Sequence, residues 1–242
     1  MTRDQSGRII DHFASTARDL TPAPARLASH VLYAAVSHDP DVTSCCASVL
    51  SAAELHRAGR FAKHGDKALF TQRRAFRRFC GALVLGSSQP LSQITFKETE
   101  NGRPYLCDLP DFWFGFSSCR FGFVGAWSST HAIGVDLEDS TKDLEAAELA
   151  RQFFSGAEAN AVQAANGLAC LRTFFQFWCL KEAALKSIGQ GLPFGLDAFE
   201  FRLDPVLRVV HAPPEHGGPE QFEAHLIEDT DSCGALVIRS LT

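Results

Sequence analysis

Two short segments of the 242-residue chain carry carboxylates at a spacing that suits metal or phosphate chemistry. In residues 133–138, apolar side chains alternate with Gly134, Asp136 and Glu138. On a β-strand this alternation would project both carboxylates from one face, beside a glycine. Facing carboxylates repel unless a cation or protons lie between them, and Mg²⁺ commonly takes one or two carboxylates together with substrate phosphates. An edge strand with a solvated polar face is the alternative interpretation.

The second segment, residues 178–186, has the composition of a helix. Trp178, Glu182 and Lys186 follow one another at i, i+4 spacing, which places them on one stripe, and Lys181 directly precedes the glutamate. A carboxylate with two amines nearby would suit an anionic ligand that is held through a metal ion. An ordinary Glu–Lys surface pair beneath a buried tryptophan would give the same pattern.

Together, the two segments resemble the signature of the Sfp-type 4′-phosphopantetheinyl transferases. That signature joins a Gly-Val-Asp-x-Glu strand to a Trp-x-x-Lys-Glu-Ala/Ser-x-x-Lys helix, and both parts occur here in that order. The resemblance extends over most of the chain, from about residue 51 to residue 201. Its further parts are a basic block, an Asn-Gly-Arg-Pro turn, a Phe-Phe-Ser segment and a Gly-Gln-Gly-Leu segment, at residues 54–78, 101–104, 153–158 and 189–192.

The resemblance implies a reaction and a set of residues for it. The chain would transfer 4′-phosphopantetheine from coenzyme A to a serine of an apo acyl or peptidyl carrier protein, releasing 3′,5′-ADP. Mg²⁺ would be the cofactor, held by Asp136, Glu138 and Glu182. The implied catalytic residues are Glu182 as the base, Lys186 for the leaving phosphate, and Asp136. The residues implied to bind coenzyme A are Arg57, Arg60, Arg103, Pro104, Ser117, Ser118, Lys181 and Lys186.

Within that set, the resemblance assigns Arg57 and Arg60 to the 3′-phosphate and Lys181 to the pyrophosphate, while Arg103 and Pro104 would border the nucleotide. Taken alone, the basic stretch over residues 57–78 is typical of a solvated helix face. The resemblance makes part of it an anchor for coenzyme A and leaves Arg74 and Arg78 with structural roles.

One position departs from the family pattern. The family usually has Asn-x-Ser-His-Ser before the acidic strand, and its histidine helps to hold the 3′-phosphate of coenzyme A. In this chain Ser118 stands at that position. A hydroxyl can donate a hydrogen bond to phosphate but carries no positive charge. Arg120, two residues further on, is a candidate to supply the missing charge.

Two other functions fit the same residues. A metal-dependent phosphohydrolase could use the carboxylates to activate water on coenzyme A or a nucleotide, although the sequence has neither a P-loop nor a Nudix-like helix rich in glutamate. A non-catalytic coenzyme A-binding homologue is the second alternative, and the missing histidine is its support.

Composition excludes some broad classes of protein. The net charge of −5 argues against a general nucleic-acid binder, because phosphate backbones are bound by an excess of Lys and Arg. The eight cysteines form no C-x-x-C pair, which argues against a zinc ribbon or a thioredoxin motif. We find no signal peptide and no run of about 18 apolar residues. We therefore expect a cytoplasmic monomer that binds neither nucleic acid nor membrane.

The pattern of apolar residues and turns predicts the elements that must position these groups. A helical region is expected from about residue 51 to Gly86, with Leu69, Phe76, Cys80 and Leu83 on one face and Arg74 and Arg78 opposite them. Residues 112–127 read as a loop with one strand over 121–127. Helix starts are expected at Ser140 and Ser155, and Gly167 is expected to end the second helix. The remaining predicted elements are strands at 31–36, 94–98, 105–107, 133–138, 198–203, 207–210, 221–228 and 235–238, and a long helix at 168–188.

This order of elements predicts an α+β fold with two similar α+β subdomains related by a pseudo-two-fold. We expect an amino-terminal subdomain over residues 1–130, which contacts the nucleotide of coenzyme A. A carboxy-terminal subdomain over residues 131–242 would carry the metal and catalytic residues, with the active site at the interface. No element is predicted for the first thirty residues, where Pro22 and Pro24 suggest a lead-in or a packed arm.

Overall fold

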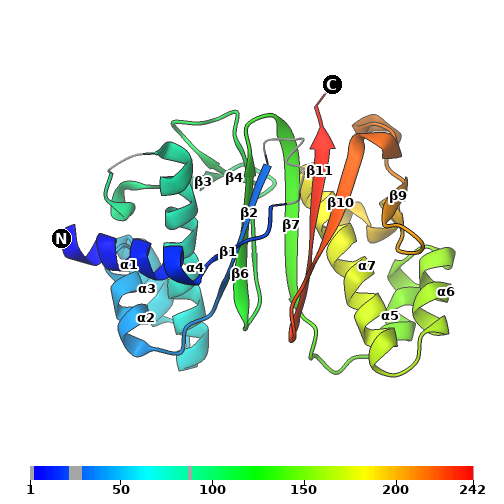
Figure 1. The fold of residues 1–242 in the computed structure, drawn as a ribbon, viewed down its shortest axis with the longest axis horizontal. Coiled ribbons are helices and arrows are strands. Elements are labelled where there is room, and N and C mark those ends of the chain that lie inside the picture. Colours follow the sequence, from blue (N-terminus) through cyan, green and yellow to red (C-terminus); the bar gives the residue numbers. More distant parts are fainter. Residues whose placement is uncertain (1–2, 22–28, 87–88, 242) are drawn as a thin grey trace.

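The computed structural model describes residues 3–21, 29–86 and 89–241. Helices and strands are mixed along the chain, as expected for the α+β class. Figure 1 shows the arrangement: strands occupy the centre, α1 to α4 lie on one outer side, and α5 to α7 lie on the other. No helix within the described ranges combines the length and the apolar character needed to cross a membrane.

The first half of the chain builds a four-stranded antiparallel sheet in the order β1-β2-β6-β5. Its helices are α1 (Arg3–Thr16), α2 (Pro40–Ala47), α3 (Ala52–Gly59) and α4 (His64–Leu85). Its strands are β1 (Arg18–Asp19), β2 (Ser29–Ala35), β5 (Trp113–Ser118) and β6 (Gly122–Ser128), and β3 (Phe96–Glu98) pairs with β4 (Pro104–Leu106) as a separate hairpin. α4 packs on β6 through Phe76, whose ring stacks on that of Phe123 with a centroid distance of 5.8 Å.

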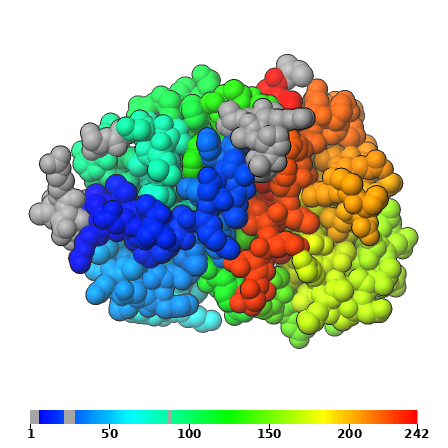
Figure 2. Space-filling view, viewed as in Figure 1, coloured from blue at the N-terminus to red at the C-terminus, as the bar shows by residue number. Residues whose placement is uncertain are grey.

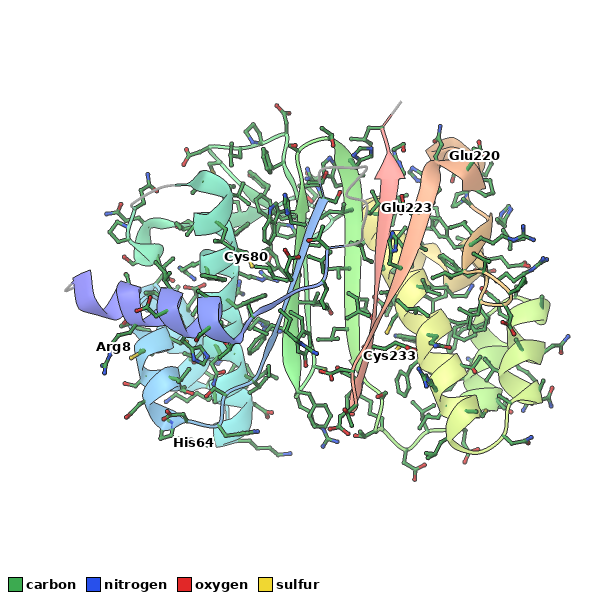
Figure 3. The ribbon with its side chains drawn as sticks, viewed as in Figure 1. Arg8, His64, Cys80, Glu220, Glu223 and Cys233 are labelled. Atoms are coloured by element: carbon green, nitrogen blue, oxygen red, sulfur yellow. The ribbon has the colours of Figure 1, made fainter. Side chains whose placement is uncertain are left out.

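The second half builds a three-stranded antiparallel sheet in the order β10-β11-β7. Its strands are β7 (His131–Asp139), β10 (Phe222–Glu228) and β11 (Ser232–Ser240), and β8 (Glu200–Arg202) pairs with β9 (Arg208–His211). Its helices are α5 (Ala146–Phe153), α6 (Gly156–Ala164) and α7 (Leu168–Ser187). α7 lies across this sheet, where the Cys179 thiol donates a hydrogen bond to the carbonyl of Cys233 at 3.2 Å (Cys233 is labelled in Figure 3).

An apolar layer joins the two sheets in the centre of the molecule. β2 and β6 contribute Val31 and Val124, and β7 contributes Val135 and Leu137, all of them buried. The outer faces of both sheets are covered by helices, so the sequence of layers is helix, sheet, sheet, helix (Figure 1). Burial of apolar area between the sheets favours close packing of β5 on β7, where a Cβ on Gly115 would lie 3.2 Å from Cγ1 of Val135.

The amino-terminal segment also reaches the second half. Arg18 of β1 forms an ion pair with Asp229, in the turn after β10, at 2.8 Å. In Figure 2 the blue amino-terminal surface accordingly lies beside the red-orange surface of the carboxy-terminal strands. α1 itself is anchored by Ile9 and Phe13, which are buried in the first half. Pro22 and Pro24 lie outside the described residues.

Several predicted elements are confirmed. β2, β7, α7 and the carboxy-terminal strands lie where the pattern places them, and the predicted capping box of Ser155 and Glu158 starts α6. Gly86 ends α4 with a φ of 56°, in the left-handed region that glycine adopts without strain.

The helical region predicted over residues 51–86 is confirmed, and it is divided into two helices, because α3 ends before residues 60–63 turn the chain into α4. Other predictions are wrong. Residues 112–127 were predicted to hold one strand, but they contribute to two, β5 and β6. Leu83 is 49% exposed whereas Arg78 is buried, so the predicted faces of α4 do not hold. No helix begins at Ser140, and Gly167 precedes α7 instead of ending α6, which stops at residue 164.

Candidate active site

A glycine brings β7 and α7 into direct backbone contact. A Cβ on Gly134 would lie 1.9 Å from the carbonyl oxygen of Ala183, 2.5 Å from the amide nitrogen of Ser187 and 2.9 Å from Cβ of Lys186. Since no side chain fits there, the strand lies against the helix backbone. Asp136 follows two residues later on the same face of the strand, so it points at the same helix.

Asp136 and two residues of α7 form a compact charged cluster. The Lys186 Nζ donates to the Asp136 Oδ1 at 2.6 Å and lies 3.6 Å from the Glu182 Oε2. The side chain of Asp136 is 4% exposed, that of Glu182 is 17% exposed and that of Lys186 is 34% exposed. The structure therefore brings together the three residues predicted to be catalytic. Because Lys186 is partly exposed, a ligand can contact the cluster at this side chain.

Two of the three predicted metal ligands, Asp136 and Glu182, belong to this cluster, and the third is Glu138. Glu138 lies two residues beyond Asp136 on β7 and forms an ion pair with Lys142 at 2.6 Å. The second oxygen of Asp136, Oδ2, is buried and has no hydrogen-bond partner. A buried carboxylate oxygen without a partner is costly, and a cation or a donor from a ligand would satisfy it.

Burial and charge shift the proton affinities of the cluster. Burial raises the pKa of Glu182, and the neighbouring Asp136 and Glu138 carboxylates add to this effect against the opposing charge of Lys186. For Lys186, burial disfavours the charged form, but the Asp136 and Glu182 carboxylates outweigh it and raise the pKa of the ammonium. Lys186 thus stays charged and acts as the counter-ion of the two carboxylates.

The donor set fits a hard divalent cation in its chemistry. Asp136, Glu138 and Glu182 offer oxygen ligands only, which is what Mg²⁺ prefers, and the partnerless Asp136 Oδ2 is available to it. Within the described residues, however, no three His, Cys, Asp or Glu side chains converge closely enough to hold a metal ion at once. Lys186 and Lys142 instead neutralise the carboxylates in this structure.

The end of β5 carries two serines that face opposite ways. Ser117 donates from its hydroxyl to the Asp136 Oδ1 at 3.0 Å. Ser118, on the other face of the strand, accepts from the Arg73 Nη1 at 3.4 Å. β5 therefore connects the carboxylate cluster to α4, and this connection could not be predicted without recognising the strand.

Arg120 does not supply charge at Ser118. Its Nε pairs with the Asp139 Oδ2 at 2.8 Å, its Nη2 donates to the Thr141 hydroxyl at 2.5 Å, and its guanidinium lies 4.6 Å from the centre of the Phe121 ring. These contacts hold its guanidinium at the end of β7. The expectation that it compensates for the missing histidine is wrong in this structure.

Three guanidinium groups converge on one aromatic ring of the first half. Those of Arg57, Arg73 and Arg74 lie 5.5, 5.7 and 5.3 Å from the centre of the Phe70 ring. We call these three residues the arginine cluster. Arg57 was predicted as a coenzyme A contact and lies in it. A cavity of about 610 Å³ opens nearby, and its lining includes Leu69, which is one helical turn before Arg73.

Glu54 is the carboxylate paired with this region. It binds the Arg78 Nη2 at 2.7 Å and the Arg74 Nε at 3.6 Å, and it also completes the capping box of Ser51 at the start of α3. Arg74 and Arg78 therefore have the structural contacts that the sequence predicts for them.

Lys181 lies apart from the charged cluster. Its side chain is 0% exposed and pairs with the Glu158 Oε2 at 2.8 Å, while its Nζ also donates to the carbonyls of Leu196 and Phe199 at 2.9 and 2.5 Å. The expected contact between Lys181 and a pyrophosphate conflicts with this burial. In this structure Lys181 fixes α7 to α6 and to the segment that follows α7.

The remaining predicted contacts lie elsewhere on the first half. The guanidinium of Arg103 lies 4.2 Å from the ring centre of Trp113, at the opposite end of β5 from Ser117 and Ser118. Pro104 begins β4 beside it. Arg60 follows α3 with an exposed side chain. The structure does not bring these three residues into the carboxylate cluster.

Sequence reasoning missed two residues near the site. Lys142 follows Glu138 by four positions, so the spacing of opposite charges was a usable signal. Arg73 was one arginine in a run of basic residues, and its contact is with a serine 45 positions away. No local signal distinguishes it.

Part of the chain that includes the cluster resembles known proteins. Residues 132–234, which include β7 and α7, match the model of the family described as the 4′-phosphopantetheinyl transferase superfamily. The chain is 36% identical over 137 residues to 4′-phosphopantetheinyl transferase Sfp of Bacillus subtilis (57% of this chain, 60% of that protein). It is 32% identical over 130 residues to 4′-phosphopantetheinyl transferase psf-1 of Bacillus pumilus (54% of each).

A longer match is found with 4′-phosphopantetheinyl transferase HetI of Nostoc, at 32% identity over 164 residues (66% of this chain, 67% of that protein). The alignments with the two Bacillus proteins span little more than half of their length.

Proposed function

Because this chain belongs to the 4′-phosphopantetheinyl transferase superfamily, we propose that it transfers 4′-phosphopantetheine from coenzyme A to a serine of an apo acyl or peptidyl carrier protein, releasing 3′,5′-ADP. The observation that carries the proposal is the cluster of Asp136, Glu182 and Lys186 between β7 and α7. It combines a buried and a half-buried carboxylate with a partly exposed ammonium, as a site for a negatively charged phosphoryl group requires.

The reaction is a displacement at the phosphorus that carries pantetheine. The hydroxyl oxygen of the carrier serine forms the new bond to this phosphorus, and the bond from phosphorus to the bridging oxygen breaks. The electron pair leaves with 3′,5′-ADP. Glu182 accepts the serine proton, directly or through a water, and Lys186 stabilises the negative charge on the leaving phosphate.

Asp136 has a positioning role as well as a place in the metal site. Its Oδ1 accepts hydrogen bonds from the Lys186 ammonium and the Ser117 hydroxyl, so it orients both groups toward the cluster. Asp136, Glu138 and Glu182 would hold Mg²⁺ when it is bound. The ion would supply positive charge to the pyrophosphate of coenzyme A and so lower the energy of the developing charge.

The first half supplies the contacts to the nucleotide in this proposal. Arg57, in the arginine cluster, and Arg60 would bind phosphate, and Arg103 with Pro104 would border the base or the ribose. The site then lies between an amino-terminal subdomain over residues 1–130 and a carboxy-terminal subdomain over residues 131–242. We propose that these subdomains are related by a pseudo-two-fold and that the chain acts as a cytoplasmic monomer.

The test uses the purified chain with coenzyme A, Mg²⁺ and a panel of apo carrier proteins. Mass spectrometry should show each modified carrier heavier by one phosphopantetheine group, and a carrier with its acceptor serine changed to alanine is the matched control. An unmodified mass for every carrier in the panel would refute the proposal.

The same samples separate the alternatives. Release of 3′,5′-ADP without a carrier would indicate a phosphohydrolase, because water would then be the acceptor. Binding of coenzyme A without any transfer would indicate a non-catalytic homologue.

A further inference from the structure

Arg73 is a partly buried cation that lacks a negative partner. Its Nη1 lies 3.4 Å from the Ser118 hydroxyl, a long contact, and its Nε is buried without a hydrogen-bond partner. Across the described part of the chain, no carboxylate lies within ion-pair distance of Arg73. A guanidinium with unused donors in a partly buried place is expected to gain from an anion.

The neighbours of Arg73 add to the positive charge. Arg57 and Arg74 lie around the same Phe70 ring, and burial together with these two charges lowers the pKa of Arg73. Glu54 is already shared between Arg74 and Arg78. It therefore balances only one of the four positive charges of Arg57, Arg73, Arg74 and Arg78. The region is therefore built with more positive charge than it neutralises, and a phosphate with about two negative charges would correct this.

Coenzyme A offers one phosphate for this place, if the proposed function holds. Its pyrophosphate belongs at the carboxylate cluster, where the bond breaks. The group that remains is the 3′-phosphate, a monoester with three free oxygens that suits a guanidinium and a hydroxyl. The two serines at the end of β5 connect the carboxylate cluster to Arg73, because Ser117 faces Asp136 and Ser118 faces Arg73.

We propose that Arg73, with Ser118, binds the 3′-phosphate of coenzyme A and supplies the positive charge that this strand position otherwise lacks. The charge comes from Arg73 of α4 and not from Arg120, whose guanidinium is held by Asp139 and Thr141. The inference rests on the proposed function for the identity of the ligand. The anion site itself rests on the contacts of Arg73.

The test compares coenzyme A with dephospho-coenzyme A, which lacks only the 3′-phosphate, as substrates for carrier modification. The parent chain should prefer coenzyme A in kcat/KM. Arg73→Gln should reduce that preference by roughly 10- to 100-fold, as expected for the loss of a hydrogen bond to a charged group, and should act mainly through KM. Arg73→Lys should keep part of the preference, because the charge remains.

Arg120→Gln is the matched control, since it also removes one positive charge close to Ser118 in the sequence. The Arg120 side chain is itself 62% exposed, and Asp139 keeps its hydrogen bonds from Thr141, so the variant should fold normally and keep the parental preference for coenzyme A. Thermal unfolding of each variant verifies that the fold is retained. An Arg73→Gln variant that is folded and keeps the parental preference would overturn the inference.

A binding measurement keeps this result separate from the proposed function. Calorimetry with adenosine 3′,5′-bisphosphate and with 5′-AMP reports the 3′-phosphate contact without any transfer. If no carrier is modified but the bisphosphate binds more tightly in a manner that depends on Arg73, the proposed function fails and the anion site stands. If the carrier is modified but Arg73→Gln binds both nucleotides as the parent does, the function stands and the inference fails.

Discussion

Gly134→Ala should damage the site without removing any chemical group from it. The new Cβ would lie 1.9 Å from the Ala183 carbonyl oxygen, and contacts below 3.0 Å are essentially never tolerated. Opening the approach from 1.9 to 3.0 Å requires β7 and α7 to separate by about 1.1 Å. Because two of the three nearest atoms belong to the helix backbone, no side-chain rotation relieves the clash. We expect a loss of roughly 3 kcal/mol in the free energy of unfolding, at the upper end for overpacked interiors.

The same movement should weaken the charged cluster. A separation of that size would stretch the 2.6 Å contact between Lys186 and Asp136 beyond hydrogen-bonding distance. Carrier modification should therefore fall by at least about tenfold at a temperature where the variant remains folded. The midpoint temperature of thermal unfolding should fall by roughly 6 to 12 °C, because each kcal/mol corresponds to about 2 to 4 °C in a chain of this size.

Gly156→Ala is the matched control for this experiment. Gly156 lies in α6 without a positive φ, and no atom lies within 4 Å of the place that an alanine methyl group would take, so the substitution should change stability by less than about 1 kcal/mol. If Gly134→Ala melts within about 2 °C of the parent, less than the shift expected for 1 kcal/mol, and modifies carriers at the parental rate, the close approach of β7 to α7 is not what positions the cluster.

Further predictions concern the charges and the thiols. Asp136→Asn should lower carrier modification by at least about 100-fold while circular dichroism stays unchanged, and activity within about tenfold of the parent would contradict the site. Lys181→Met should lower the free energy of unfolding in urea by roughly 3 to 5 kcal/mol, because it leaves Glu158 buried without its partner. Adding Glu158→Gln should restore part of this stability. A loss below about 1 kcal/mol for Lys181→Met would mean that the pair is not buried in solution. Removal of divalent cations with a chelator should abolish transfer and Mg²⁺ should restore it, whereas full activity in the chelator would exclude the proposed cofactor. Burial raises the pKa of Cys46 to about 12, so at about pH 8 it remains a neutral thiol. Alkylation followed by mass spectrometry should label the exposed Cys107 in the folded protein and Cys46 only after unfolding. Equal labelling of both cysteines in the folded protein would contradict the burial of Cys46.

The parts of the site that the sequence predicts are those set by local geometry. Alternation along β7 places Asp136 and Glu138 on one face, and helical spacing places Glu182 next to Lys186; both patterns need only a few neighbouring residues. The backbone contact at Gly134 then brings the two elements together. These local rules, joined to the family resemblance, are sufficient for the core of the site.

The parts that could not be predicted depend on residues far apart in the chain. Lys181 has the sequence context of an exposed lysine, and its burial comes from Glu158 on α6 and from carbonyls after α7. β5 is rich in phenylalanine and packs between other elements, so it lacks the alternation of a half-exposed strand. Arg73 looks like its arginine neighbours until β5 brings Ser118 to it.

The two serines that end β5 make the site sensitive to the length of the chain before them. Because successive side chains of a strand leave opposite faces, Ser117 reaches the second half of the molecule and Ser118 reaches α4. Insertion or deletion of one residue within β5 would exchange these directions, even if both serines were kept. Substitutions along this strand can therefore be neutral where changes of length are not, and related sequences should vary in composition here far more readily than in the number of residues.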